Sequence, residues 1–330
     1  MAKFVATASV PDITCQILAP YGPIQITPEN STEALRASID DDVIGLILRG
    51  HSAAPGDLIR SAKGLRVIGR TGVGYDTVDV DTATECGVAV ITTPGANAAT
   101  VAEASVAYFL ALNKRIAYWD QQMKTGNWES RNKLMARDIA GLTVGIIGFG
   151  NIGQEVARML ASFQVTLIAC DPYADASAAQ ELNVELLELE EVLARADTVC
   201  LHTMLTDQTR GLIDRRQIQA MKPGSFLINL SRGGVIESLD AIIAGLNDGP
   251  LAGAALDVFD PEPPDFDHPI FQHPSVLTAP HAMAMTPQAM ERMAEMMATG
   301  IAAVLNGERP PRVVVNPKVL DRAPGGTIGV

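Results

Sequence analysis

The chain has 330 residues, of which 47% are apolar and 19% are charged, and this length allows two domains with large cores. Asp and Glu outnumber Lys and Arg by 38 to 25, so the formal net charge is −13. A protein that binds nucleic acid or an anionic lipid surface needs a basic stripe, and this sequence has none. We therefore expect neither nucleic acid nor a membrane as a partner.

The first third of the chain predicts a parallel sheet. Its apolar amino-terminal run is too short for a signal peptide and is closed by Asp12, so we expect a first strand there. Helical segments separate this run from four more Val- and Ile-rich runs, an alternation typical of parallel strands covered by helices. The five predicted strands are 4–10, 24–27, 43–49, 65–69 and 88–92.

A second set of apolar runs follows the same pattern. The runs are continuously apolar instead of alternating, which indicates strands buried on both faces. The fold class predicted for the chain is therefore α/β, with two doubly wound parallel-sheet domains. The strands of the second set are 143–149, 165–171, 198–203, 225–230, 253–258 and 276–278.

Two long helices are predicted to cross between the sheets. One runs from about 100 to 115, and Thr100 with Glu103 fits a capping box at its start. The other begins at Thr286, carries a methionine stripe that predicts core packing, and ends near residue 307. The stripe consists of Met290, Met293, Met297, Ile301 and Val304. The predicted domains are 1–99 with 286–330, and 100–285.

Membrane spans, disulfides and zinc sites are not expected. The longest uncharged stretch, 268–290, is interrupted by four prolines. The four cysteines have no CxxC spacing and lie in apolar runs, which predicts reduced core thiols in a cytoplasmic protein. They are Cys15, Cys86, Cys170 and Cys200.

A glycine-rich turn joins the strand at 143–147 to an amphipathic helix. In this setting the first glycine permits the tight turn, the second lets the backbone approach a pyrophosphate, and the third lets the helix pack on the strand. The amino terminus of the helix offers N–H groups to phosphates. The predicted dinucleotide contacts are Gly148, Gly150, Asn151, Ile152 and Gly153.

Asp171 ends the next predicted strand and indicates which dinucleotide binds. A carboxylate there accepts hydrogen bonds from ribose hydroxyls and repels a 2′-phosphate, and no arginine follows it in Pro172-Tyr173-Ala174. NAD is therefore predicted over NADP. The alternative is a purely structural turn with a solvated aspartate.

Three further segments place ionisable groups at strand ends, where ligands of such sheets bind. An arginine flanked by glycines on a strand-to-helix turn can present a planar fork to a carboxylate. Each segment alone is more often structural, so their order along the chain carries the information. The segments are 229–234 with Arg232, 256–264 with Asp257 and Glu262, and 277–281 with His281.

The ordered motifs GFGNIG, Asp171, LSRGG, LDVFDPEPP and APH resemble those of the D-isomer-specific 2-hydroxyacid dehydrogenase family. The match extends to RTGVGYD at 70–76 and TPGAN at 93–97, and so covers nearly the whole chain. The resemblance is greatest to the phosphoglycerate dehydrogenase branch, and a short form without a regulatory domain is expected. The resemblance implies a flavodoxin-like substrate domain, a Rossmann NAD-binding domain and a cleft between them.

The resemblance also implies a role for each site residue in interconverting a D-2-hydroxyacid and its 2-oxoacid. Arg232 would hold the substrate carboxylate and polarise the carbonyl, His281 would be the acid/base, and Glu262 would hydrogen-bond His281. The backbone around Val73 and Gly74 would receive the carboxylate. The remaining cofactor contacts implied are Asp257 at the nicotinamide carboxamide, Thr203, Leu230 and His281 itself.

Elementary chemistry agrees with this trio. Hydride transfer to C2 leaves an alkoxide, which needs a proton donor and a fixed positive charge, and imidazole suits that exchange near neutral pH. Spacing alone leaves Asp260 and Asp265 as rivals of Glu262. The remaining histidines have no metal-ligand spacing, so no metal is expected. They are His51, His202, His268 and His273.

Departures from the family pattern leave the substrate open. Met204 stands where the family usually has proline, and Met283 and Met285 follow His281, where they either line the pocket or pack between helices. Arg49 ends a strand, and an arginine near the substrate phosphate in the phosphoglycerate branch implies a second anionic group on the acid. The alternative for Arg49 is a surface ion pair.

The resemblance implies a homodimer formed through the cofactor domains, with segment 131–137 reaching the neighbouring subunit. The alternatives are a hydroxypyruvate or glyoxylate reductase, an NAD-sensing corepressor-like protein, and a formate- or phosphite-type dehydrogenase. Formate enzymes use an amide where Glu262 stands, and this acidic chain lacks the basic tails of a corepressor.

Overall fold

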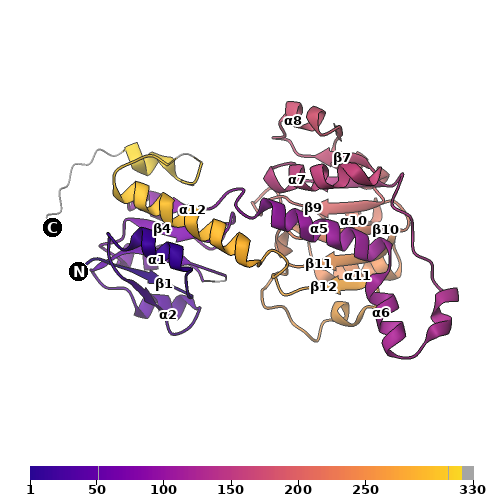
Figure 1. Ribbon diagram of the computed structural model, residues 1–330, viewed down its shortest axis with the longest axis horizontal. Coiled ribbons are helices and arrows are strands. Elements are labelled where there is room, and N and C mark those ends of the chain that lie inside the picture. Colours follow the sequence, from indigo (N-terminus) through magenta and orange to yellow (C-terminus); the bar gives the residue numbers. More distant parts are fainter. Residues whose placement is uncertain (51, 311, 322–330) are drawn as a thin grey trace. The chain divides into compact units, whose positions relative to one another are not determined.

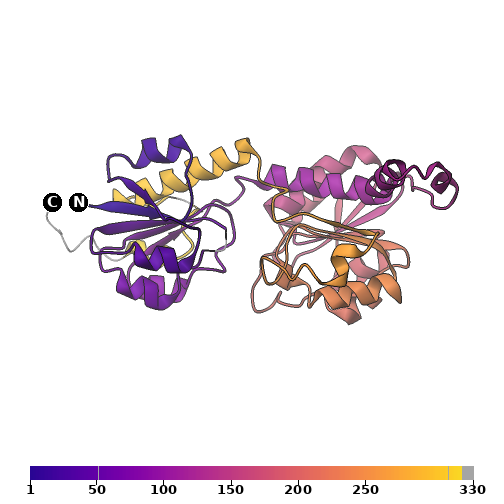
Figure 2. The same cartoon turned by 90° about the horizontal axis from the view of Figure 1, so that it is seen from below.

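The computed structural model describes residues 1–50, 52–310 and 312–321, and the chain divides into two compact units (Figures 1 and 2). Unit 1 combines Met1–Asn97 with the segment that begins at Met285, and unit 2 is Ala98–Ala284. The chain therefore passes between the units at 97–98 and 284–285, where the sequence places the boundaries at 99–100 and 285–286.

Unit 1 is built on a five-stranded parallel sheet in the order β2-β1-β3-β4-β5. Most of its core residues fall into two large clusters, one on each face of the sheet: Leu35, Leu58 and Ala83 belong to helices of one face, and Leu18 and Ile301 to helices of the other. The strands are β1 Lys3–Ala6, β2 Ile24–Ile26, β3 Val43–Leu48, β4 Val67–Arg70 and β5 Ala89–Ile91. The helices are α1 Asp12–Leu18, α2 Thr32–Ala37, α3 Gly56–Ser61, α4 Val80–Glu85 and α12 Pro287–Leu305.

Helix α12 begins as predicted. The Thr286 side chain accepts a hydrogen bond from the Ala289 N–H at 3.1 Å, and Pro287 occupies the first helical position. Met293, Met297 and Ile301 are buried, so the predicted core packing of the stripe is confirmed for them. The helix lies so close to β4 that a Cβ on Gly69 would be 2.7 Å from Ile301 Cδ1, which explains a glycine within a strand.

Unit 2 is built on a seven-stranded parallel sheet in the order β12-β11-β10-β9-β6-β7-β8, and the doubly wound α/β fold class is confirmed. The strand order reverses between β6 and β9, and ligands of open α/β sheets bind at such a switch point. The strands are β6 Thr143–Ile147, β7 Thr166–Cys170, β8 Val184–Leu186, β9 Thr198–Leu201, β10 Ser225–Asn229, β11 Leu251–Leu256 and β12 Val276–Thr278.

Helices cover both faces of this sheet (Figure 1). Helices α5 and α7 share one core cluster with the strands, and α9, α10 and α11 share the other. The helices of unit 2 are α5 Ala98–Asn113, α6 Ile116–Lys124, α7 Asn151–Leu160, α8 Ala176–Glu181, α9 Leu189–Arg195, α10 Arg215–Gln219 and α11 Leu239–Asn247.

The predicted capping box at Thr100 is wrong. Helix α5 begins at Ala98, so Thr100 is a buried residue of its first turn and not its cap. Two alanines, the best helix formers, precede Thr100 and extend the helix toward the amino terminus. The helix ends at Asn113 and not at 115, because Arg115 adopts a left-handed conformation with φ of 55°.

The cysteine prediction is only half right. None of the four is paired, but Cys15 and Cys86 are exposed and only Cys200 is fully buried. Cys15 lies on the outer face of the short helix α1, and Cys86 follows the end of α4.

Within the described residues, no helix combines the length and apolarity needed to cross a membrane, and no three His, Cys, Asp or Glu side chains are grouped to hold a metal ion.

Candidate functional site

The glycine turn after β6 forms a backbone cradle at the switch point of the unit 2 sheet. Gly148 has φ of 94°, and a Cβ on it would lie 2.7 Å from the backbone of His202 and Thr203. A Cβ on Gly153 would overlap the Gly148 carbonyl oxygen, so α7 can approach β6 only with glycine there. A Cβ on Gly150 would meet nothing within 4 Å, which leaves open space where a pyrophosphate approaches the backbone.

Helix α7 presents its amino terminus at the same cradle. Its N-cap is Gly150, which has no side chain to occupy the N–H groups of the first turn. Asn151 is exposed and Ile152 is half-buried, so their backbone lies at the open end of the helix. The cradle and the helix dipole together fit a dinucleotide phosphate.

Asp171 lies directly beyond β7 and is held by the backbone of the cradle. Its Oδ2 accepts a hydrogen bond from the Phe149 N–H at 2.8 Å, and its Oδ1 accepts one from the Tyr173 N–H at 2.8 Å. Each carboxylate oxygen has a second lone pair that can accept from a ribose hydroxyl. The geometry therefore fits NAD, as the sequence predicts.

His281 and Glu262 form a hydrogen-bonded pair beyond the carboxyl ends of β11 and β12. His281 Nδ1 donates to Glu262 Oε2 at 2.8 Å, and Glu262 Oε1 accepts from the Phe259 N–H at 2.9 Å. The Glu262 side chain is 15% exposed and that of His281 is 44% exposed, so the carboxylate is sheltered while the ring reaches solvent. This pairing orients the imidazole and leaves Nε2 on the opposite side of the ring.

The rival carboxylates are engaged elsewhere. Asp260 lies 3.4 Å from Arg210 in an exposed ion pair, and Asp265 accepts from the Asp267 N–H at 3.0 Å. Spacing along the chain could not separate these acids from Glu262, because the choice depends on how the loop folds back at Phe259.

Asp257 braces the His281 loop against the sheet. It is 3% exposed, its Oδ1 accepts from the Ala282 N–H at 2.9 Å, and its Oδ2 accepts from the Met283 N–H at 3.2 Å. Burial raises the pKa of this carboxyl group. Asp257 therefore fixes the residues that follow His281, a contact that the sequence motifs did not indicate.

Arg232 lies on the turn after β10 and is held through a buried asparagine. Asn229 Nδ2 donates to the Arg232 carbonyl oxygen at 2.9 Å, and Asn229 Oδ1 accepts from the Ser231 N–H at 3.0 Å. Arg232 Nη1 donates to the Ser231 carbonyl oxygen at 2.8 Å. Sequence reasoning missed Asn229 as a residue that positions Arg232. The available signal was an asparagine at the end of an otherwise apolar strand, because an amide that such a strand buries needs hydrogen-bond partners.

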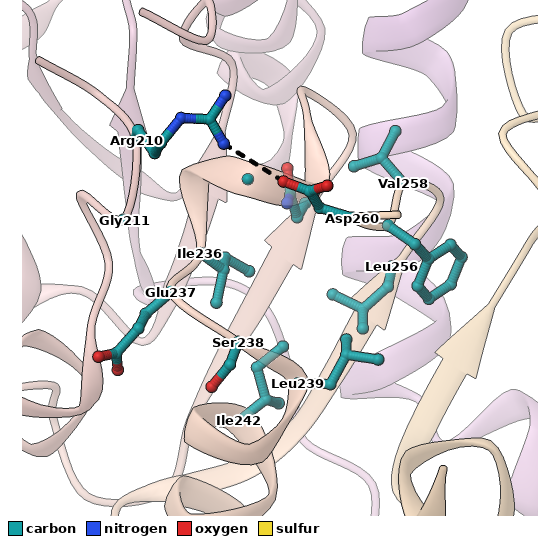
Figure 3. Close-up of a pocket in the computed structure, with 14 residues that line it drawn as sticks. Arg210, Gly211, Ile236, Glu237, Ser238, Leu239, Ile242, Leu256, Val258 and Asp260 are labelled. Atoms are coloured by element: carbon teal, nitrogen blue, oxygen red, sulfur yellow. Dashed lines mark hydrogen bonds and ion pairs between the residues drawn. The ribbon is translucent and has the colours of Figure 1, made fainter. Parts of the chain in front are cut away.

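The two glycines after Arg232 let this turn pack against the loop that leads to Glu262. A Cβ on Gly233 would overlap the Phe259 carbonyl group, and one on Gly234 would lie 2.7 Å from Asp260 Oδ2. Figure 3 shows the Arg210–Asp260 ion pair, and both residues line a cavity of about 320 Å³. The apolar wall of the cavity consists of Ile236, Leu239, Ile242, Leu256 and Val258.

The remaining predicted contacts of unit 2 lie at neighbouring strand ends. Thr203 is half-buried just beyond β9, and Leu230 is buried at the end of β10. Met283 packs against the core cluster that contains α5 and α7, whereas Met285 and Met204 are each 53% exposed.

The substrate contacts expected in unit 1 follow β3 and β4. Arg49 is half-buried, its Nη2 lies 3.9 Å from Met290 Sδ, and no carboxylate among the described residues pairs with it. Val73 and Gly74 belong to the turn after β4, where the Gly72 N–H donates to Thr93 Oγ1 at 3.0 Å. The alternative interpretation of Arg49 as half of a surface ion pair therefore finds no partner in residues 1–50, 52–310 and 312–321.

His202 is a half-buried residue next to the glycine cradle, with its imidazole turned inward. Its Nε2 lies 3.0 Å from the Ser105 hydroxyl, Nδ1 is enclosed with no partner among the described residues, and burial lowers its pKa to about 4. Since the unfolded chain takes up the proton near pH 6.5, stability is full above that pH and falls as pH drops toward 4.

We expect the free energy of unfolding to drop by ~2 kcal/mol more between pH 7 and pH 5 in the wild type than in His202→Gln. Urea unfolding followed by circular dichroism at the two pH values measures the difference. His273→Gln, which changes a half-buried histidine away from the glycine cradle, is the matched control and should behave as the wild type. An identical pH response in all three proteins would show that His202 is not held neutral.

Unit 2 combines three features of a dinucleotide-binding α/β domain: the glycine cradle, a carboxylate beyond the second strand, and a reversal of strand order at the cradle. The protein is therefore a two-domain α/β protein that binds a dinucleotide. The chain belongs to the D-isomer specific 2-hydroxyacid dehydrogenase family, because residues 106–283 match the NAD binding domain of that family. The family predicted from the ordered motifs and the predicted NAD cofactor are both confirmed.

The chain is similar to D-3-phosphoglycerate dehydrogenase 2, chloroplastic, of Arabidopsis thaliana, with 36% identity over 318 residues that cover 96% of this chain and 50% of the relative. The chain spans about half the length of the first curated relatives it matches.

The chain is also similar in structure to solved proteins, including two that cover most of its length. The TT0316 protein from Thermus thermophilus is 32% identical, with a TM-score of 0.85 and coverage of 95% and 99% of the two chains. The NAD-dependent formate dehydrogenase from Staphylococcus aureus is 26% identical, with a TM-score of 0.83 and coverage of 96% and 99%.

Proposed function

We propose that this protein is an NAD-dependent dehydrogenase that interconverts a D-2-hydroxyacid and its 2-oxoacid. The observation that carries the proposal is the pairing of His281 with Glu262 at 2.8 Å, within the family's NAD-binding domain and beyond its strand ends. A strand-end imidazole oriented by a sheltered carboxylate is the arrangement that proton exchange with an alcohol or a carbonyl requires.

In the proposed mechanism each residue acts at a stated atom. NAD, when bound by the cradle and Asp171, supplies or accepts the hydride. His281 Nε2 donates its proton to the 2-oxo oxygen during reduction and removes the 2-hydroxyl proton during oxidation. Glu262 holds the ring through Nδ1, and Arg232 binds the carboxylate with its guanidinium fork. Thr203, Leu230 and Asp257 would line the nicotinamide.

We further propose an acid with a second anionic group, of which a 3-phosphoglycerate-like acid is one example. Two observations support this proposal. Arg49 carries a guanidinium that pairs with no carboxylate of the described residues, and the relatives at 35–36% identity are named D-3-phosphoglycerate dehydrogenases. The charge on Arg49 is then available for phosphate, sulfonate or carboxylate.

A panel of oxoacids tests both parts of this proposal. NADH oxidation should be measured with phosphohydroxypyruvate, sulfopyruvate, hydroxypyruvate, glyoxylate and pyruvate. We expect the doubly charged acids to have the largest kcat/KM, and Arg49→Met to remove that preference. Preferred turnover of glyoxylate or hydroxypyruvate would instead identify a reductase of simple oxoacids. NADH binding without turnover of any acid would favour a dinucleotide-sensing protein.

We also propose that the protein is a cytoplasmic homodimer that forms through its NAD-binding units. Helix α6 and the residues after it expose large apolar side chains: none of the residues of α6 is buried, Trp128 is 60% exposed and Met135 is 85% exposed. A monomeric protein rarely exposes such side chains together. Light scattering should give twice the chain mass for the wild type and the chain mass for Trp128→Glu combined with Met135→Glu.

A further inference from the structure

Arg70 is a buried arginine at the end of β4 that does not belong to the site described above. It is 8% exposed, and its guanidinium donates from two nitrogens to two backbone carbonyls. Nε donates to the Gly74 oxygen at 3.0 Å, and Nη1 donates to the Gly50 oxygen at 2.8 Å. One side chain thus joins two turns that follow neighbouring strands, since Leu48 of β3 pairs with Arg70 of β4.

These two turns carry the residues expected to contact the substrate in unit 1. The first begins with Arg49 and Gly50, and the second contains Val73 and Gly74. Both use backbone conformations that glycine favours, with φ of 66° at Gly50 and 129° at Gly72. Neither turn belongs to the sheet ladder, so the shape of each depends on the groups that hold it.

The second turn is held from both sides. On one side the Gly72 N–H donates to Thr93 Oγ1, and the Thr93 N–H donates to the Gly72 carbonyl oxygen, both at 3.0 Å. On the other side is Arg70, bonded to the Gly74 oxygen. Because a peptide group is planar and trans, fixing the Gly74 carbonyl also fixes the direction of the N–H of the next residue.

We propose that Arg70 is a positioning residue for the oxoacid, which sets the turn that receives the carboxylate and ties it to the turn that carries Arg49. The inference rests on the proposed function. A planar guanidinium can bond two carbonyls in fixed directions, whereas the single ammonium of lysine cannot reproduce that fork. The loss of Arg70 therefore weakens acid binding without touching the His281–Glu262 pair or the glycine cradle, all of which lie in unit 2.

Hydroxypyruvate and phosphohydroxypyruvate provide a sharp test, because they differ only in the phosphate. We expect Arg70→Ala to raise KM about 30-fold for both acids, through loss of two charge-assisted hydrogen bonds. Because uniform binding is removed, kcat should stay within about threefold of the wild type. The Kd for NADH, measured by fluorescence, should not change. An acid that is not turned over is measured as a competitive inhibitor instead.

Two further measurements separate positioning from a general loss of structure. Millimolar guanidinium should lower the KM of Arg70→Ala toward the wild-type value. Arg66→Ala is the control, because Arg66 is exposed just before the same strand, and guanidinium should not change the KM of that variant. Arg70→Lys keeps the charge and is expected to give an intermediate KM. Should Arg70→Ala fail to fold, Arg70→Lys decides the question through the same KM and kcat comparison.

The same measurements test the positioning role of Arg70 and the proposed dehydrogenase activity separately. Unchanged KM values in folded Arg70 variants would overturn the positioning role, while the wild-type activity would leave the proposed function intact. A KM increase confined to phosphohydroxypyruvate would also overturn it, because Arg70 would then bind the second anion directly. Failure of the wild type to reduce any oxoacid with NADH would count against the proposed function itself.

Discussion

Replacement of His281 by glutamine is expected to lower kcat about 10³-fold while NADH binds with wild-type affinity. The ring donates Nδ1–H to Glu262 at 2.8 Å, so Nε2 is the nitrogen that the proposed mechanism leaves for the reacting oxygen. Glutamine can still hydrogen-bond the substrate but cannot exchange a proton with it near neutral pH. Steady-state oxidation of NADH gives kcat, and fluorescence titration gives the Kd for NADH.

The matched control is His268→Gln, because His268 is a half-buried histidine of the same unit whose ring lies beside Asp240 at 3.3 Å. That variant should keep wild-type kcat. Glu262→Gln should lower kcat less than His281→Gln does, because the amide keeps a hydrogen bond to Nδ1 and loses only the charge. Full activity in a folded His281→Gln protein would contradict the mechanism.

The second large effect is expected at Arg232. Arg232→Met should lower kcat/KM about 10³-fold, which corresponds to ~4 kcal/mol for the loss of a charged fork on the carboxylate and the polarised carbonyl. Arg232→Lys should recover only part of this loss, since a lysine makes a single-point contact. Progress curves with the best oxoacid of the panel measure the ratio.

Arg210→Met is the control for Arg232, because Arg210 lies beside the same turn but is 60% exposed and pairs with Asp260. Exposed ion pairs contribute about 0–1 kcal/mol, so kcat/KM should change by less than about fivefold. Equal losses at Arg210 and Arg232 would mean that the turn had collapsed and that neither guanidinium acts on the substrate.

Most of the fold could be predicted from the sequence because most of its strands are buried on both faces and read as continuous apolar runs. Strand β8 was missed because it has three residues, Val184–Leu186, of which only Val184 is buried. The start of α5 was misplaced for a different reason: Thr100 and Glu103 fit a capping pattern, but favourable alanines before them continue the helix.

The candidate site was likewise predictable only in part from the sequence. Spacing was sufficient for the glycine cradle and Asp171, because a strand-turn-helix unit is local in sequence. It could not choose among Glu262, Asp260 and Asp265, since that choice depends on the Phe259 N–H bond that turns the loop. Nor could it reveal the bonds of Arg70 to the Gly74 and Gly50 carbonyls, because backbone acceptors have no signature in the side-chain sequence.

The chain leaves unit 2 after Ala284, three residues beyond His281, and Asp257 fastens that short stretch to the sheet of unit 2. We therefore expect mutations to accumulate unequally on the two sides of this junction. On the proposed function, changes around Arg49 and Arg70 would alter which acid is accepted, while the His281–Glu262 pair and the glycine cradle keep their alignment within unit 2. If the proposed function holds, a lineage could change its acid through unit 1 and leave the proposed proton donor in unit 2 unaltered.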